Sequence, residues 1–179
     1  MNACILAGGK SKRFGSNKAL FKIGYETLIE RVINSIKPFF DKIIIITNEP
    51  DDYEFLKVEM KEDIIPGAGS LGGIYTGLVM SSGFKVFFIA CDLPDVAPDL
   101  IKQLIIGSEG FDVVVPKTNK GFEPLFAIYS KNCIEPIKRN LERGDLKIIN
   151  FYKQMKVKEI PADRIVNINT LKDLEQYVK

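Results

Sequence analysis

The sequence contains no histidine and only three cysteines in 179 residues. Without histidine, the chain cannot hold a Ser-His-Asp triad, a Cys-His dyad or a histidine-ligated zinc ion. Cys4, Cys91 and Cys133 are far apart, form no CxxC pair and are odd in number, which predicts reduced thiols in a cytoplasmic protein rather than a disulfide framework or a zinc site. Any chemistry must therefore come from carboxylates, lysines, arginines, backbone amides or a metal held by oxygen ligands.

Neither sign of charge dominates, and long apolar runs are missing. The chain has 25 Lys and Arg against 23 Asp and Glu, a formal net charge of +2, which is too balanced for a protein that holds nucleic acid through bulk positive charge. The longest strictly apolar run, residues 86–91, is far shorter than a membrane span. No charged leader precedes the first apolar stretch, and Gly8-Gly9-Lys10 ends it early, so we expect no signal peptide. Nucleic acid and membranes are not expected partners.

Apolar runs and helical spacings alternate along the chain. Continuous apolar or β-branched runs, typical of strands buried on both faces, occupy residues 2–7, 42–47 and 86–90. Further strands are predicted over residues 113–115, 125–129, 157–160 and 165–168. The patterns predict helices over residues 28–36, 74–81, 100–106, 134–141 and 171–178. This alternation predicts one α/β domain over residues 1–179, with a three-layer αβα, Rossmann-like fold. Its open sheet should be mostly parallel, with some antiparallel strands in the C-terminal half. In such sheets, ligands bind beyond the carboxyl ends of the strands.

Residues 8–18 follow the first expected strand and combine glycines with cations. Gly8, Gly9 and Gly15 allow sharp turns that bring backbone N–H groups close to an anion, and the cations are Lys10, Lys12, Arg13 and Lys18. Amides and cations directly after a buried strand predict a polyphosphate site; the alternative is a solvated surface loop. The spacing is not that of a Walker A motif, because five residues separate Gly9 from Gly15 and Ser16-Asn17 precede Lys18.

Residues 6–18 read Leu-Ala-Gly-Gly-x-Ser-x-Arg-Phe-Gly-x-x-Lys, which resembles the signature of nucleotidyltransferases that move NMP from an NTP to a phosphorylated acceptor. Within that group, the chain is most similar to the molybdenum cofactor guanylyltransferases. The resemblance continues in order along the chain, at Asn48, Glu62-Asp63, Pro66 to Gly73, Cys91 to Pro94, Glu123 to Leu125 and Asn167 to Thr170.

Asp92 follows the third buried strand and precedes Pro94. A carboxylate at that position can hold Mg²⁺, which takes one or two carboxylates together with phosphate oxygens. A turn or cap role is the alternative. Beside a polyphosphate loop that is rich in cations, we expect Asp92 to be the metal ligand.

A second glycine-rich segment, residues 67–72, matches GxGxxG and has Asp92 20 residues beyond it. This spacing is typical of a dinucleotide-binding fingerprint and raises the alternative of an NAD-dependent oxidoreductase. However, the preceding residues 61–66 are largely polar rather than a buried strand, and this alternative assigns no role to residues 6–18. The resemblance implies instead that this stretch recognises the base.

The resemblance implies transfer of GMP from GTP to the phosphate of molybdopterin, with Mg²⁺ as cofactor, giving the guanine dinucleotide cofactor and pyrophosphate. Its implied catalytic residues are Arg13, Lys18 and Asp92; its nucleotide-binding residues are Leu6, Ala7, Gly8, Gly9, Lys18, Asn48, Asp63 and Asp92. Transient contacts with proteins of cofactor biosynthesis or with apo-molybdoenzymes are also implied. Taken alone, Asn48 reads as a turn residue and Asp63 as a solvated acid.

The sequence departs from the family pattern in two places. Leu171 stands where members often have proline, and Glu123 stands where several have His or Gln. A carboxylate facing an anionic acceptor would be unfavourable, so the acceptor is less well defined than the nucleotide. A cytidylyltransferase for the same cofactor and a sugar- or alditol-phosphate nucleotidyltransferase remain alternatives. A nucleotide-binding module without catalysis is a further one, although it would have no need for Arg13, Lys18 and Asp92 together.

Overall fold

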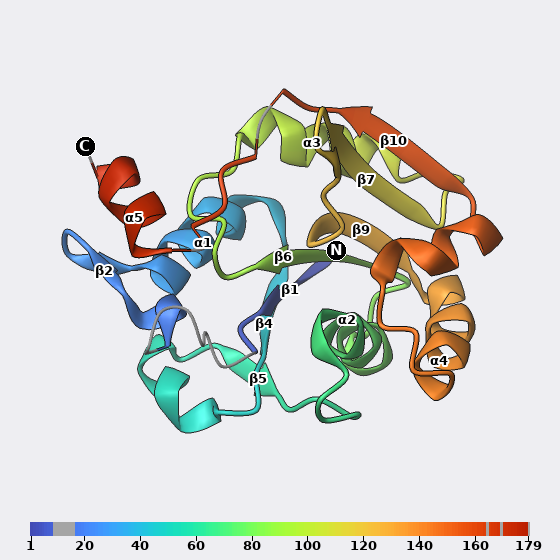
Figure 1. Ribbon diagram of the computed structural model, residues 1–179, viewed down its shortest axis with the longest axis horizontal. Coiled ribbons are helices and arrows are strands. Elements are labelled where there is room, and N and C mark those ends of the chain that lie inside the picture. Colours follow the sequence, from blue (N-terminus) through green and yellow to red (C-terminus); the bar gives the residue numbers. More distant parts are fainter. Residues whose placement is uncertain (9–16, 164, 169, 179) are drawn as a thin grey trace.

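The computed structural model describes residues 1–8, 17–163, 165–168 and 170–178. Its main sheet has the strand order β10-β7-β9-β6-β1-β4-β5, with β8 paired to β7 (Figure 1). The strands are β1 (Asn2–Leu6), β4 (Lys42–Ile46), β5 (Glu59–Lys61), β6 (Lys85–Ala90), β7 (Val113–Thr118), β8 (Gly121–Phe122), β9 (Phe126–Ser130) and β10 (Val157–Pro161). The pairs β5-β4, β4-β1, β1-β6 and β7-β10 are parallel, whereas β9 is antiparallel to β6 and β7. The predicted fold class, with its antiparallel strands in the C-terminal half, is confirmed.

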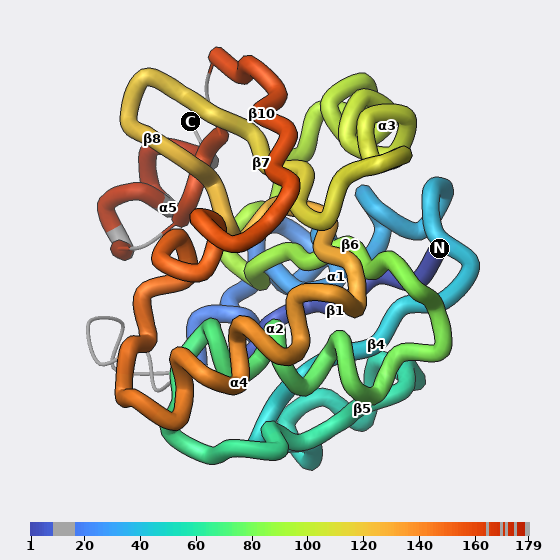
Figure 2. Tube along the Cα trace, turned by 90° about the vertical axis from the view of Figure 1, so that its right-hand side faces the viewer, coloured from blue at the N-terminus to red at the C-terminus, as the bar shows by residue number. Residues whose placement is uncertain are grey.

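Helices cover both faces of the sheet, which makes the three layers. They are α1 (Leu28–Ile36), α2 (Gly69–Met80), α3 (Pro98–Gly107), α4 (Ile134–Glu142) and α5 (Leu171–Val178). On one face, Ala3 and Ile5 of β1 pack with residues of α1 and α3. On the other, Cys4 and Leu6 pack with residues of α2 and α4, which lie side by side (Figure 2). Because β1 is buried on both faces, it reads as one continuous apolar run.

Smaller elements complete the chain and hold the first helix in place. The strands β2 (Lys22–Ile23) and β3 (Glu26–Thr27) form an antiparallel hairpin, and 3-10 helices span Lys18–Leu20, Lys37–Phe39, Pro50–Leu56, Lys131–Cys133 and Ile148–Gln154. Thr27 and Glu30 form a reciprocal capping box that starts α1. Within the described ranges, none of the helices has the length and apolar character that crossing a bilayer requires.

Two sequence predictions need correction, and several short strands were missed. Helix α2 begins at Gly69 rather than at residue 74, because the glycines that read as a loop form its first turn. The strand predicted over residues 165–168 is wrong: this segment has no strand structure, and Ile168 donates its N–H to the Asp92 carbonyl oxygen instead. The short strands β2, β3, β5 and β8 were not predicted. At α5, reciprocal bonds between Thr170 and Asp173 form the N-terminal cap.

Helix α2 packs closely against the sheet because it carries glycine where the two meet. A Cβ built on Gly77 would lie 2.4 Å from Cε1 of Phe88 in β6 and 3.0 Å from Sγ of Cys4 in β1. These distances are far below van der Waals contact, so no larger side chain fits there without displacing the strand or the helix.

The two edges of the sheet are short and charged. Strand β5 is three residues long, and its Glu59 forms ion pairs with Lys42 and Lys61. At the other edge, Glu159 of β10 pairs with Lys117 of β7 at 2.7 Å, and β10 ends at Pro161.

Candidate active site

A pocket of about 530 Å³ lies at the carboxyl ends of β1, β4 and β6, next to the start of α2. This is the edge at which open α/β sheets bind ligands. The residues that line the pocket are Leu6, Gly8, Lys18, Ile46, Asn48, Asp63, Gly67, Gly69, Ser70, Gly73, Ala90, Cys91, Asp92 and Leu125. Five of the predicted site residues lie in loops or turns beyond the strand ends and line this one pocket: Gly8, Lys18, Asn48, Asp63 and Asp92.

Lys18 and Asp92 form an ion pair inside this pocket. The Lys18 Nζ atom lies 2.6 Å from Asp92 Oδ2, and each side chain is only 16% exposed. Lys18 Nζ also donates to the carbonyl oxygen of Ile168 at 3.4 Å. The pair therefore places one cation and one carboxylate, the two groups needed to bind phosphates and a divalent metal, in direct contact.

The position of Lys18 depends on the residue before it. Asn17 accepts a bond from the Ala19 N–H and so caps the 3-10 helix that begins at Lys18. Asn17 Nδ2 donates to Tyr53 Oη at 3.0 Å, and the buried Tyr53 hydroxyl donates to the Ala7 carbonyl oxygen at 3.3 Å. These bonds join the end of β1 to the segment that carries the cation.

Asn48 and Asp63 hold each other through two bonds across the pocket's other end. Asn48 Nδ2 donates to Asp63 Oδ2 at 2.9 Å, and the Asp63 N–H donates to Asn48 Oδ1 at 3.0 Å. Burial raises the pKa of Asp63, and the bond from Asn48 partly offsets that rise. The other carboxylate oxygen, Oδ1, is buried and has no hydrogen-bond partner among the residues that the structure describes. A buried acceptor without a partner is costly, so the described residues leave one oxygen of the Asp63 carboxylate unsatisfied.

The first turn of α2 borders the pocket with glycines. Gly67 and Gly69 adopt φ values of +81° and +59°, conformations that side chains rarely accept. No side chain caps this helix, and Gly69, Ser70 and Gly73 line the pocket. Sequence reasoning found the glycines but missed that they form a helix N-terminus, whose amides can donate to a ligand.

The residues around Asp92 fit a divalent metal bound together with a phosphate. Mg²⁺ usually keeps several waters and takes one or two protein carboxylates besides phosphate oxygens, so Asp92 with a nucleotide is a sufficient donor set. A ready-made protein cage is not present within the described ranges, where no three acidic or thiol side chains cluster. Cys91 does not add a nucleophile, because burial raises the pKa of its thiol to about 12.

Glu123 faces the same end of the sheet as Asp92. In the antiparallel pair of β6 and β9, Ile89 is opposite Phe126, and the Ala90 N–H donates to the Leu125 carbonyl oxygen. Asp92 follows β6 and Glu123 precedes β9, so both lie at this end of the pair. Burial raises the pKa of Glu123; Lys120 lowers it and the Asp92 charge raises it further.

The remaining predicted residues divide into two groups. Leu6 and Ala7 are buried at the end of β1, where the Cys91 N–H donates to the Leu6 carbonyl oxygen and the Ala7 N–H donates to Ile46. Gly9 and Arg13 lie outside the described residues.

Comparison with known proteins identifies the family of the chain. Residues 3–157 match the model of the MobA-like NTP transferase domain. The chain is 40% identical over 185 residues to a protein of Desulfosudis oleivorans named molybdenum cofactor guanylyltransferase, in an alignment that covers 96% of this chain and 91% of the relative. It is 37% identical over 171 residues to a probable molybdenum cofactor guanylyltransferase of Pelotomaculum thermopropionicum, covering 96% of this chain and 82% of the relative.

A solved structure gives the same result. The molybdopterin-guanine dinucleotide biosynthesis protein A from Archaeoglobus fulgidus superposes with a TM-score of 0.83 at 26% identity, covering 98% of this chain and 96% of that chain. Nucleotidyltransferases of this family typically need a divalent metal. The family also favours nucleotidyl transfer over the dinucleotide-binding alternative for residues 67–72. The chain therefore belongs to the MobA-like NTP transferase family and is a nucleotidyltransferase.

Proposed function

We propose that the chain transfers GMP from GTP to the phosphate of molybdopterin, forming molybdopterin guanine dinucleotide and pyrophosphate. The observation that carries this proposal is the single pocket in which the Lys18–Asp92 pair lies at one end and the Asn48–Asp63 pair at the other. In the reaction, an oxygen of the acceptor phosphate bonds to the α-phosphorus of GTP. The bond between that phosphorus and the oxygen of the leaving pyrophosphate breaks.

The Asn48–Asp63 end suits the base. Guanine presents two neighbouring donors, its N1–H and its 2-amino group, and a carboxylate accepts from both. Asp63 is held in place by Asn48 and still has an unsatisfied buried oxygen. The uncapped amides at the start of α2 can donate to the guanine carbonyl oxygen. Recognition of this kind excludes bases that offer an acceptor to Asp63.

The Lys18–Asp92 end suits the phosphates. The main chain of Leu6, Ala7, Gly8 and Gly9 would bind the nucleotide, and Lys18 and Arg13 would neutralise the charge that builds on the leaving pyrophosphate. Asp92 would hold Mg²⁺, which supplies charge neutralisation at the phosphates when bound. Catalysis then rests on positioning and electrostatics, since phosphoryl-type transfer needs little covalent help.

A second pocket offers room for the acceptor. Its volume is about 510 Å³, and it shares Gly69 and Ser70 with the first pocket. Its other lining residues are mostly apolar, with two lysines: Ala68, Lys120, Gly121, Phe122, Pro124, Leu146, Lys147, Ile148 and Ile149. A flat heterocycle that carries a phosphate matches this mixture of apolar surface and positive charge. Phe122→Ala should therefore raise KM for the acceptor and leave GTP binding unchanged.

The proposal has a cellular side as well. Residues 1–179 would act as one nucleotidyltransferase domain in the cytoplasm, where thiols such as Cys4, Cys91 and Cys133, all free and buried, stay reduced. The product would pass to other proteins of cofactor biosynthesis or to apo-molybdoenzymes through transient contacts.

Thermal unfolding with Mg²⁺ and single nucleotides tests the proposal first. A ligand present at about 100 times its Kd stabilises by about 2.7 kcal/mol, so GTP should raise Tm more than CTP, ATP, UTP or NAD⁺. Release of pyrophosphate from GTP on addition of molybdopterin then tests the reaction. A preference for CTP would replace guanylyl by cytidylyl transfer, and a response to NAD⁺ alone would refute nucleotidyl transfer. No pyrophosphate with molybdopterin, despite GTP binding, would refute the acceptor.

A further inference from the structure

The segment that follows β10 returns to the active site and touches both members of its ion pair. From β10, the chain crosses the molecule to α5, which lies beside α1 (Figure 1). On the way, the Ile168 N–H donates to the Asp92 carbonyl oxygen at 2.9 Å, and the Ile168 carbonyl oxygen accepts from Lys18 Nζ at 3.4 Å. One residue of the C-terminal segment therefore bonds the main chain of Asp92 and the side-chain ammonium of Lys18.

Ile168 is itself anchored by its side chain. The side chain is completely buried in a small apolar cluster with Ile23 of the β2-β3 hairpin and Leu28 of α1, and Tyr177 of α5 packs against this cluster. Two residues after Ile168, Thr170 and Asp173 form the reciprocal cap that starts α5. The position of α5 and the position of Ile168 are thus directly linked.

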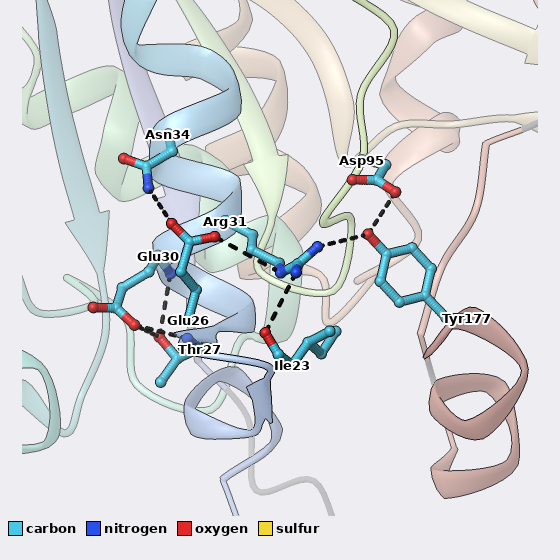
Figure 3. A network of polar contacts seen from close by, with 8 residues as sticks. All are labelled: Ile23, Glu26, Thr27, Glu30, Arg31, Asn34, Asp95 and Tyr177. Atoms are coloured by element: carbon cyan, nitrogen blue, oxygen red, sulfur yellow. Dashed lines mark hydrogen bonds and ion pairs between the residues drawn. The ribbon is translucent and has the colours of Figure 1, made fainter. Parts of the chain in front are cut away.

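Helix α5 needs contacts of this kind to stay in place. It has eight residues, and helices of that length are not stable alone in water. Tyr177 makes a polar contact between this helix and the rest of the molecule, shown in Figure 3: the Tyr177 hydroxyl donates to Asp95 Oδ2 at 2.5 Å and accepts from Arg31 Nη1 at 3.3 Å. Arg31 Nη2 also donates to the Ile23 carbonyl oxygen, in the cluster that holds Ile168.

We propose that Tyr177 is a positioning residue for the active site. Its hydroxyl holds α5 between Arg31 and Asp95, three residues beyond Asp92, and the fixed helix keeps the Ile168 peptide group against Lys18 and Asp92. This inference rests on the roles proposed above for Lys18 and Asp92. Tyr177 acts through main-chain bonds and lines neither of the two pockets assigned above to nucleotide and acceptor.

The test compares Tyr177→Phe with Tyr25→Phe. Tyr25 lies at the tip of the β2-β3 hairpin and is fully exposed, so it controls for the loss of a tyrosine hydroxyl. Tyr177→Phe should lower kcat about tenfold, because small displacements of catalytic groups have large effects on rate. KM for GTP should change less than kcat, and the Ile168 amide should exchange hydrogen for deuterium faster. Tyr25→Phe should behave as the unaltered chain does in all three measurements.

Binding of Mn²⁺ with GTP, followed by calorimetry, separates this inference from the proposed function. If the unaltered chain fails to turn over GTP, the proposed function fails; Tyr177→Phe should still weaken Mn²⁺ binding, because Asp92 is less well held. Unchanged Mn²⁺ affinity in a folded Tyr177→Phe protein would overturn the inference. A loss of activity without faster exchange at Ile168 would overturn the route through Ile168.

A mutant cycle with Asp95 tests the contact itself. Asp95→Ala should lower kcat as Tyr177→Phe does, and combining the two should cause no further loss, because both remove the same bond. Asp95→Asn keeps an acceptor oxygen and should recover most of the rate. Additive losses in the double variant would mean that Asp95 and Tyr177 act separately, which contradicts the proposal.

Discussion

Replacing Asp63 by asparagine should change which purine the pocket prefers. Asn48 Nδ2 donates to Asp63 Oδ2, and Asn48 Oδ1 is already used by the Asp63 N–H, so the orientation of Asn48 is fixed. In Asp63→Asn, the new amide oxygen would take the place of Oδ2 and the new NH₂ group the place of Oδ1, the oxygen without a described partner. A donor would then stand where guanine also brings a donor.

The size of the effect follows from the bond that is lost. A hydrogen bond to a charged group contributes about 1.5–3 kcal/mol, which corresponds to roughly 10- to 150-fold in affinity. GTP should lose this factor in Asp63→Asn. XTP, which has an oxygen in place of the 2-amino group, should gain relative to GTP by a similar factor. The fold should not suffer, because burial raises the pKa of Asp63 and a neutral amide avoids the cost of a buried charge.

Titration calorimetry with GTP, ITP and XTP measures both changes. In the unaltered chain, ITP should bind more weakly than GTP, since it lacks the 2-amino donor. Asp99→Asn is the matched control, because Asp99 lies on the exposed side of α3 and pairs with Lys102. Equal loss of GTP and XTP affinity in Asp63→Asn, or unchanged GTP affinity, would show that Asp63 does not read the base.

Three further predictions concern charge and packing. Lys18→Met and Asp92→Asn should each slow turnover about 10²–10³-fold and lower Tm, because each removes one member of a partly buried ion pair. Calorimetry of the double variant should show Tm partly restored, and strictly additive losses would contradict the pairing. GTP affinity should fall as the pH drops through the raised pKa of Asp63, because protonation removes a hydrogen-bond acceptor for guanine. The fall should occur at a higher pH than the titration of an exposed aspartate. Calorimetry with ATP should show no such fall in affinity. Gly77→Ala should destabilise the fold by about 1–3 kcal/mol in urea titrations, whereas Gly107→Ala, with contacts of 3.4 Å, should have little effect.

Sequence patterns predicted the layers of the fold well where burial is continuous. Strands β1, β4 and β6 carry unbroken apolar runs because helices cover both faces of the sheet. Patterns failed where local sequence and tertiary contacts disagree. Residues 165–168 are mostly β-branched, as in a strand, but the Ile168 N–H donates to the Asp92 carbonyl oxygen rather than to a neighbouring strand.

Part of the candidate site was also predictable, because some of its residues follow strands that the sequence identifies. Asn48 and Asp92 directly follow buried strands, so the rule that ligands bind at carboxyl ends locates them. The pairing of Asn48 with Asp63, 15 residues apart, depends on how the 3-10 helix Pro50–Leu56 and β5 return the chain to the end of β4. The bond between Tyr177 and Asp95 joins residues 82 apart in sequence. No spacing rule connects positions so distant, and only the folded chain brings them together.

The charged edges of the main sheet affect how copies of the molecule meet. A sheet edge offers unpaired backbone groups that can accept a strand from another chain. Strand β5 offers only three residues, beside the Lys42, Glu59 and Lys61 charges, and β10 ends in a proline that has no N–H to donate. Both edges are therefore poor templates for strand addition, which protects the parallel core from edge-to-edge aggregation at high protein concentration.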